Sequence, residues 1–344
     1  MDADLLLAPM AELSHRALRE LIESFNSNSV KCYFTEMINA GTLLGGGPFE
    51  AFYLDNGPIP EKLVYQLVGP NHDQLVKAAA LLNERECAGI DINMGCSAPA
   101  IRRTGAGVAW MSSVDKAGEL IAALRRVTRR RLSVKLRLGA GIEPPEAEFD
   151  YLVRFCRRLE ACGLDFITLH PRTAREKFRR ESRWEYVVCL RDELGIPVAG
   201  NGDIADAADL VRHAELVSGA GRTGPVMVGR AAVRQPWIFA VARDLEKKVT
   251  EPQPSPLAGE GSSVLDTNLE EIGLRFMELL AKYQPTEFHV SRARRFFGFF
   301  CDNLKWGNYV KNLLNREQDL LGVEKAWRKF FEENPEEKAL RQVF

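Results

Sequence analysis

The sequence predicts an α/β fold, a (β/α)8 TIM barrel followed by a small C-terminal all-helical bundle domain. Eight short apolar runs alternate with longer helical patterns between residues 1 and 245, which is the order of elements in such a barrel. A doubly wound sheet is the alternative, but the Gly-x-Gly-x-x-Gly that would follow its first strand is missing. We therefore expect residues 1–245 to form one barrel domain, the catalytic domain of the chain.

Each expected strand is a short apolar run, and each expected helix carries apolar residues at helical spacing. The strands are predicted at Leu5–Pro9, Cys32–Thr35, Leu63–Leu67, Ile90–Asn93, Ser133–Leu138, Phe166–His170, Pro197–Asn201 and Val226–Gly229. Helices between them are predicted, for example, at Asp73–Arg85, Val114–Val127, Glu146–Cys162 and Trp184–Leu194.

A linker is predicted over residues 246–264, because Thr250 to Ser263 read TEPQPSPLAGEGSS. Proline, glycine and serine at this density disfavour regular structure. The helical domain then occupies residues 265–344. Its predicted helices are Leu265–Tyr283, Val290–Leu304, Val310–Gln318 and Val323–Glu333.

Composition narrows the cellular setting. The chain has 344 residues and a formal net charge of −1, which leaves room for locally clustered charge. Seven cysteines without a repeated spacing argue against a disulfide scaffold and favour a reducing cytoplasm. No signal peptide and no apolar run long enough to span a bilayer are apparent. We expect a cytoplasmic protein with no membrane association.

The segment Asp91 to Cys96 reads DINMGC and follows a predicted strand. In a barrel of this kind the reactive groups lie on loops at the carboxyl ends of the strands. Asn93 and Cys96 can therefore face one small planar substrate. An isolated cysteine is more often a buried structural thiol, so the interpretation depends on the other strand ends.

The last two strands end in small residues, Asn201-Gly202-Asp203 and Gly229-Arg230. Glycine allows backbone N–H groups to approach a ligand closely, and these two loops commonly hold a phosphate in TIM barrels. Arg230 could add a charge-assisted bond. Together the two strand ends predict a phosphate site.

Polar residues at the other strand ends complete a ring around the mouth. Strand alternation makes Lys135 and Arg137 point the same way, and a lysine there is best explained by an anionic ligand. The remaining candidates are His170, Arg172, Gln66, Pro9 and Met10. The pattern suits flavin mononucleotide (FMN), with Lys135 stabilising the reduced anionic flavin and Gln66 bonding its polar edge.

These stretches resemble the tRNA-dihydrouridine synthase family, in its order and spacing. The matching stretches are Ala8–Ala11 (APMA), Thr35–Met37 (TEM), Gln66–Gly69 (QLVG), Asp91–Cys96 (DINMGC), Val134–Arg137 (VKLR), His170–Arg172 (HPR), Gly200–Asp203 (GNGD) and Val228–Arg230 (VGR). They span nearly the whole predicted barrel, and the helical tail agrees with the family's architecture.

The resemblance implies an oxidoreductase that uses FMN and NADPH or NADH to reduce the C5–C6 double bond of a uridine in tRNA. It implies Cys96 as the proton donor to C5 and Asn93 and Arg172 as uracil contacts. The residues that it places on FMN are Pro9, Met10, Gln66, Lys135, His170, Asn201, Gly202, Asp203, Gly229 and Arg230. Ser97 stands where the family usually has proline.

Basic residues follow the sixth strand, among them Arg175 and Lys177. We expect these two to bind substrate RNA on the rim that holds Cys96, and residues 265–344 to form an RNA-recognition domain. The target uridine must leave its stack to react. We infer no obligate protein partner and expect a monomer, and no metal site is predicted.

Two other functions remain open. One is an FMN barrel dehydrogenase acting on a free pyrimidine, of the dihydroorotate type, which the tail and the rim arginines disfavour. The other is a catalytically degraded RNA-binding protein, which the presence of Cys96, Lys135 and Asn93 disfavours. The modified uridine, the choice between tRNA and ribosomal RNA, and the choice between NADPH and NADH stay undetermined.

Overall fold

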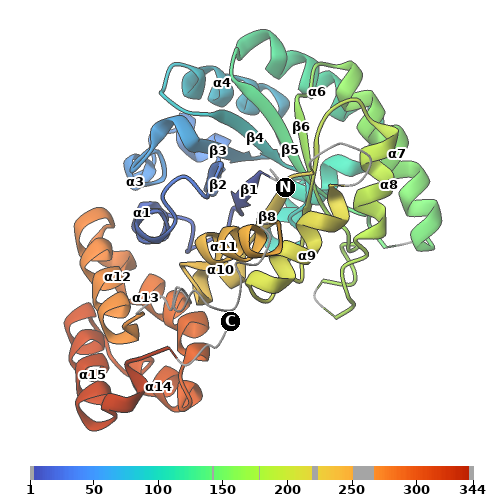
Figure 1. The fold of residues 1–344 in the computed structure, drawn as a ribbon. Coiled ribbons are helices and arrows are strands. Elements are labelled where there is room, and N and C mark those ends of the chain that lie inside the picture. Colours follow the sequence, from blue (N-terminus) through green and yellow to red (C-terminus); the bar gives the residue numbers. More distant parts are fainter. Residues whose placement is uncertain (1–3, 142, 178, 219–223, 251–266, 341–344) are drawn as a thin grey trace.

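Eight parallel strands close into a barrel, and a group of helices from the C-terminal part of the chain packs against one side of it (Figure 1). The structure is a computed structural model that describes residues 4–141, 143–177, 179–218, 224–250 and 267–340. Both parts of the predicted fold class, the (β/α)8 barrel and the helical tail, are confirmed.

The strands pair in sequence order, and β8 closes the barrel on β1. Their bounds are β1 Leu5–Leu7, β2 Cys32–Asn39, β3 Leu63–Val68, β4 Gly89–Asn93, β5 Arg131–Arg137, β6 Phe166–His170, β7 Val198–Asn201 and β8 Val226–Val228. Strand β2 continues past the predicted end at Thr35. Its register on β3 shifts between Phe34 and Met37, where the Thr35 hydroxyl accepts the backbone N–H of Gln66 at 3.0 Å. A side chain thus bridges the irregular step.

Helices surround the barrel (Figure 1). In the barrel they are α1 Arg16–Phe25, α2 Ala40–Leu44, α3 Glu50–Tyr53, α4 His72–Asn83, α5 Pro99–Arg103, α6 Val114–Val127, α7 Pro145–Ala161, α8 Glu185–Glu193, α9 Ala207–Val217, α10 Arg230–Arg234 and α11 Ile238–Thr250, with 3-10 turns at Pro60–Lys62 and Gly107–Ser112. The tail contributes α12 Leu269–Tyr283, α13 Thr286–Phe300, α14 Gly307–Leu314 and α15 Leu320–Glu333, with 3-10 turns at Cys301–Asn303 and Pro335–Glu337.

The predicted linker began too early. Residues 246–250 belong to helix α11, because Phe239, Ala242 and Leu245 place an apolar stripe against the barrel and Glu246 pairs with Arg243 at 3.0 Å on the same helix. The rest of the predicted linker, residues 251–264, lies outside the described residues.

The lower half of the barrel interior is apolar. Leu6, Phe34, Val64 and Phe166 fill it, each of them buried. The polar residues of the barrel interior that could meet a ligand lie nearer the carboxyl ends of the strands.

The helical domain has an aromatic core. The rings of Phe276 and Phe296 stack with centroids 3.7 Å apart, and Trp327 packs on Phe297 at 4.7 Å. Gly273 on α12 makes this possible, since a Cβ there would lie 2.5 Å from the Trp327 ring. Helices α12 and α15 approach closely around that glycine.

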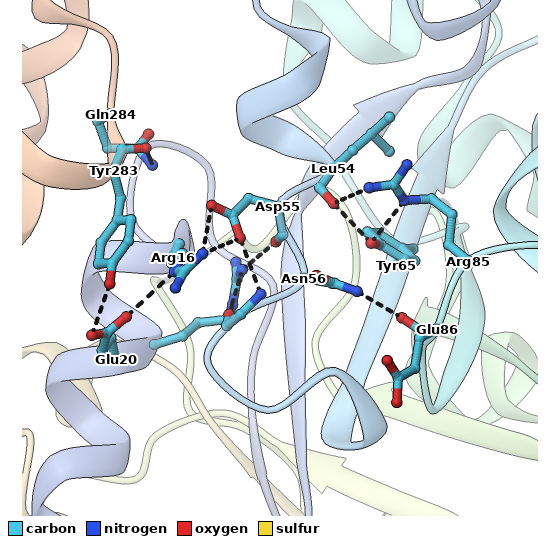
Figure 2. Close-up of polar contacts among 12 residues, drawn as sticks. Arg16, Glu20, Leu54, Asp55, Asn56, Tyr65, Arg85, Glu86, Tyr283 and Gln284 are labelled. Atoms are coloured by element: carbon cyan, nitrogen blue, oxygen red, sulfur yellow. Dashed lines mark hydrogen bonds and ion pairs between the residues drawn. The ribbon is translucent and has the colours of Figure 1, made fainter.

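The helical domain is docked on the barrel through helix α1. The Tyr283 hydroxyl donates to Glu20 at 3.1 Å, and the Arg16 guanidinium lies 3.9 Å from the centre of the Tyr283 ring. Arg16 also pairs with Asp55 at 2.9 Å on the loop before β3 (Figure 2). A chain of polar contacts thus connects α12, α1 and this loop.

A buried ion pair adds to this interface. Glu36 of β2 and Arg292 of α13 lie 3.0 Å apart, and both side chains are almost fully buried. The Glu36 carboxylate also accepts the backbone N–H of Glu12 at 2.5 Å. One carboxylate therefore connects the loop after β1 to helix α13, which fixes α13 beside the barrel mouth. In the described part of the chain, no helix combines the length and the apolar character needed to cross a membrane.

Candidate active site

A cavity of about 610 Å³ opens at the carboxyl ends of the strands. Its apolar lining residues include Met10, Leu13, Met37, Met227 and Phe299. Among the described residues, the charged side chains that line the cavity are mostly basic. They are Lys135, Arg137, Arg172, Arg230 and Arg295, and Asp203 is the acidic one. The volume is that of a typical cofactor site, and the charge favours an anionic ligand.

Most of the predicted site residues meet in this cavity. They are Pro9, Met10, Asn93, Cys96, Lys135, His170, Arg172, Asn201, Gly202, Asp203, Gly229 and Arg230. They come from the ends of six strands that are far apart in sequence. The barrel topology alone brings them together.

Three predicted contacts do not line the cavity. Gln66 was expected on the cofactor, but its side chain is fully buried and its amide bonds Asp91 at 2.7 Å and Asn93 at 2.9 Å. Strand register explains this, because Gln66 pairs with Asp91, one layer below Asn93. Arg175 and Lys177 are exposed outside the cavity.

The loop after β6 turns outward for a local reason. Glu176 accepts the backbone N–H of Thr173 at 2.7 Å and pairs with Arg183 at 2.8 Å. These contacts close the loop on itself. Arg175 and Lys177 are left on its outer surface, where they can meet a large substrate but not a ligand inside the cavity.

The loop that carries Cys96 is held from several directions. The Asn93 side-chain oxygen accepts the backbone N–H groups of Gly95 at 3.3 Å and Cys96 at 2.9 Å. Arg137 donates to the Gly95 carbonyl at 2.9 Å, and Val108 N–H donates to the Cys96 carbonyl at 3.0 Å. Cys96 is half-buried and lines the cavity. A thiol with a fixed backbone can present a proton at a defined position.

The charges of Lys135 and His170 differ because their surroundings differ. Burial, together with Arg137, lowers the pKa of Lys135 to about 8, so it is still largely an ammonium at neutral pH. Burial and the neighbouring Lys135 and Arg137 lower the pKa of His170 to about 2. His170 is therefore a neutral imidazole at physiological pH and cannot serve there as an imidazolium acid.

Arg172 and Asp203 form an ion pair inside the cavity, with N–O distances of 2.6 and 2.7 Å. Burial opposes ionisation of Asp203, but the backbone N–H of Ser182, at 2.6 Å, and Arg172 outweigh it and hold the pKa of Asp203 below its usual value. Asp203 has a positive φ of 55°. It fixes both Arg172 and the loop after β6.

Two cavity residues come from the helical domain, and the sequence placed neither of them at the cavity. Arg295 and Phe299 lie one turn apart on α13 and line the cavity mouth. Arg295 pairs with Glu12 of the barrel at 2.7 Å. No local sequence pattern predicts that Arg295 and Phe299 line the cavity, because their position depends on how the helical domain packs on the barrel. Asp91 was also missed, although its alternation with Asn93 along β4 was visible.

The donor set fits a planar ligand with an anionic tail. A Cβ on Gly202 would lie 2.4 Å from the Ser182 hydroxyl and 3.0 Å from the His170 ring. Only glycine therefore leaves this part of the cavity lining free of side-chain atoms. No cluster of His, Cys, Asp and Glu among the described residues could hold a metal ion.

Fold and cavity together define a TIM-barrel protein with a cationic ligand site that a C-terminal helical domain partly covers. The sequence model of the family described as "Dihydrouridine synthase (Dus)" matches residues 6–332, and the chain belongs to this family.

Curated relatives are similar over most of the chain. A probable tRNA-dihydrouridine synthase of Aquifex aeolicus is 29% identical over 72% of this chain and 76% of its own length. One of Rhodobacter capsulatus is 28% identical over 88% and 87%. The tRNA-dihydrouridine synthase B of Pseudomonas aeruginosa is 27% identical over 96% and 93%.

Proposed function

We propose that this protein is a tRNA-dihydrouridine synthase that reduces the C5–C6 double bond of a uridine in tRNA, with FMN as cofactor and NADPH or NADH as reductant. One observation carries the proposal. Cys96, Asn93 and Lys135 converge on one cationic cavity in a chain of the dihydrouridine synthase family.

The cavity residues would hold FMN in two groups. Asn201, Gly202, Gly229 and Arg230 suit the phosphate end. The apolar side chains of Pro9 and Met10 suit one face of a flat ring system, and His170 and Lys135 suit its polar edge. Bound FMN would supply the hydride for C6 of the uracil. The Lys135 ammonium favours negative charge on whatever lies beside it.

Cys96 would donate the proton that C5 requires. Negative charge develops at C5 when hydride reaches C6, and a neutral thiol can quench it as a general acid. His170 is neutral, so it would contact the cofactor and would not donate this proton. Asn93 lies next to Cys96 in the cavity and retains a side-chain N–H that can orient the uracil.

The tRNA would approach over the rim. Arg175 and Lys177 are exposed there, and Arg295 of α13 stands at the mouth. Phosphate contacts from such residues position RNA without reading its sequence. The depth of the cavity requires that the uridine leave its stack. Arg172, which is already paired with Asp203, would border the uracil.

Two measurements test the proposal. Purified protein should release FMN on denaturation and should form dihydrouridine in unmodified tRNA with NADPH or NADH. Mapping dihydrouridine in RNA from cells with and without the protein then identifies the position. Release of FAD, or no flavin even after reconstitution with excess FMN, would contradict it. Turnover of a free pyrimidine without tRNA would instead identify a dihydroorotate-type dehydrogenase.

A further inference from the structure

A continuous chain of hydrogen bonds runs through the barrel interior below the cavity. The Ser133 hydroxyl donates to one oxygen of Asp91 at 2.6 Å, and the Gln66 amide donates to the other at 2.7 Å. Asn93 donates to the Gln66 oxygen at 2.9 Å, and the backbone N–H of Cys96 donates to the Asn93 oxygen at 2.9 Å. The chain joins the deepest carboxylate of the barrel to the Cys96 loop.

Barrel register builds this chain. Gln66 pairs with Asp91, and Asp91 pairs with Ser133, so three neighbouring strands place polar side chains at one level. Asn93 lies two residues further along β4, on the same interior face. Asp91, Gln66 and Ser133 are buried. Apolar residues of equal size would be less costly at these positions, so stability does not explain them.

The chain has one allowed direction. An ionised carboxylate only accepts hydrogen bonds, so Gln66 must present its N–H group to Asp91. The Gln66 oxygen then faces Asn93 and must receive the Asn93 N–H. That leaves the Asn93 oxygen for the loop, where the backbone N–H of Cys96 requires an acceptor. The two ends of the chain demand the same orientation of both amides.

We infer that Asp91 is a positioning residue, which sets the orientation of Gln66 and Asn93 and thereby fixes the backbone of Cys96 at the cavity. The inference rests on the proposed role of Cys96 as proton donor. Asp91 itself touches neither the cavity nor Cys96. It acts through two amides that would otherwise have two orientations each.

Exchange of two isosteric groups tests the direction of the chain. Asp91→Asn alone gives position 91 both a donor and an acceptor, so Gln66 and Asn93 can turn over together and present an N–H group, rather than the Asn93 oxygen, to the backbone of Cys96. Asp91→Asn combined with Gln66→Glu moves the carboxylate from position 91 to position 66 and the amide the other way. The new amide then donates to the new carboxylate, which still accepts from Asn93. Asn93 therefore keeps its wild-type orientation in the double variant, with its side-chain oxygen accepting the backbone N–H of Cys96.

Amide hydrogen exchange of the segment 93–98 is measured beside single-turnover reduction of tRNA. We expect exchange at Cys96 to accelerate by about tenfold in Asp91→Asn, since the Asn93 oxygen is no longer held toward the Cys96 N–H. In the double variant, exchange and turnover should both return to within about threefold of the wild type, as expected of a coupled pair. Thr168→Val is the matched control, because Thr168 is a fully buried barrel residue whose hydroxyl has no hydrogen-bond partner.

Three results would overturn the inference. One is a double variant with exchange no slower than in Asp91→Asn, because the orientation of the amides would then not depend on the carboxylate. The second is slower turnover in Asp91→Asn with unchanged exchange at Cys96, because Asp91 would then serve Lys135 instead. If Asp91→Asn does not fold, Gln66→Met removes the bonds to Asp91 and Asn93 without adding charge, and wild-type exchange in that variant is the third. A wild type that forms no dihydrouridine defeats the proposed function, while the exchange cycle still decides the positioning role.

Discussion

The interiors of the two domains differ in composition. The helical domain buries aromatic rings, and its described buried polar side chains are Thr267, Gln284 and Arg292, of which Gln284 and Arg292 bond each other near the barrel. The upper barrel buries Gln66, Asp91 and other polar groups beneath a cationic cavity. Burial of polar groups costs free energy unless each is bonded. The barrel therefore needs the bonds among these groups to keep them buried, whereas the helical domain is stabilised mainly by aromatic packing.

The largest expected difference between the two domains is in the effect of replacing a cysteine on the single-turnover rate. Cys96→Ala should keep flavin and RNA binding but lose about 10² to 10⁴ in single-turnover rate, the usual contribution of a general acid. Cys301→Ala, in the helical domain, removes a fully buried thiol and should change stability but not chemistry. Oxidation of the pre-reduced protein by unmodified tRNA measures both rates. A Cys96→Ala rate within about threefold of wild type would remove Cys96 from the mechanism.

Truncation of the aromatic core tests the other side of the comparison. Trp327 is fully buried, and its N–H donates to the Glu270 carbonyl at 3.0 Å. Trp327→Ala should lower the free energy of unfolding by about 3 to 5 kcal/mol. RNA affinity should fall more than flavin affinity, because the cavity is mostly barrel. Thermal unfolding followed by flavin release and by far-UV circular dichroism separates the two effects.

The control is Leu321→Ala, since Leu321 is exposed on α15 and its loss should change stability by less than about 0.5 kcal/mol. Equal costs in the two variants would show that the aromatic core does not dominate the stability of the helical domain.

Most of the fold followed from the sequence because barrel strands are short, apolar and regularly spaced. The cavity lining followed as well, since strand ends in a barrel converge on one face. The contributions of α13 could not be predicted. Arg295 and Phe299 reach the cavity through the contacts of α12 with α1 and through the Glu36–Arg292 pair, and these are properties of docking between residues far apart in sequence.

Two other differences from the sequence analysis have local causes. Gln66 was predicted on the cofactor from its place at a strand end, and the register with Asp91 sets its side chain one layer below the cavity lining, so its contact with a cofactor stays a prediction. The linker was predicted to begin at residue 246 because more weight was given to the proline-rich composition than to the apolar periodicity. That periodicity continues in helix α11, which extends to Thr250. Composition marks where regular structure fails, but it does not fix the last turn of a helix.

The buried ion pair between the domains gives the next effect in size. Arg292→Met would leave Glu36 buried without its partner, which should cost about 3 kcal/mol. Burial already raises the pKa of Glu36 although Arg292 opposes this, and the substitution should raise it further. A carboxyl with a raised folded-state pKa binds its proton more readily when folded, so stability increases as the pH falls through that value.

The loss of unfolding free energy in Arg292→Met, relative to the wild type, should therefore become smaller as the pH falls. Urea unfolding at a series of pH values measures this difference. Glu36→Gln combined with Arg292→Met is the control, since it removes the charge and should flatten the dependence. A deficit that grows as the pH falls would contradict the assignment to Glu36.

The exposed pair between the domains should have the smallest effect on stability and a distinct effect on binding. Arg295 and Glu12 are each about half exposed and lie 2.7 Å apart at the cavity mouth. Breaking such a pair should change stability by less than about 1 kcal/mol. Arg295→Ala should weaken tRNA binding and reduce the salt dependence by about 0.9 in slope if Arg295 meets one phosphate. Glu12→Gln should instead strengthen binding, because Arg295 is then released from its carboxylate partner. Binding titrations of the flavin-loaded protein at several salt concentrations measure both, and equal affinities in the two variants would show that Arg295 only joins the domains.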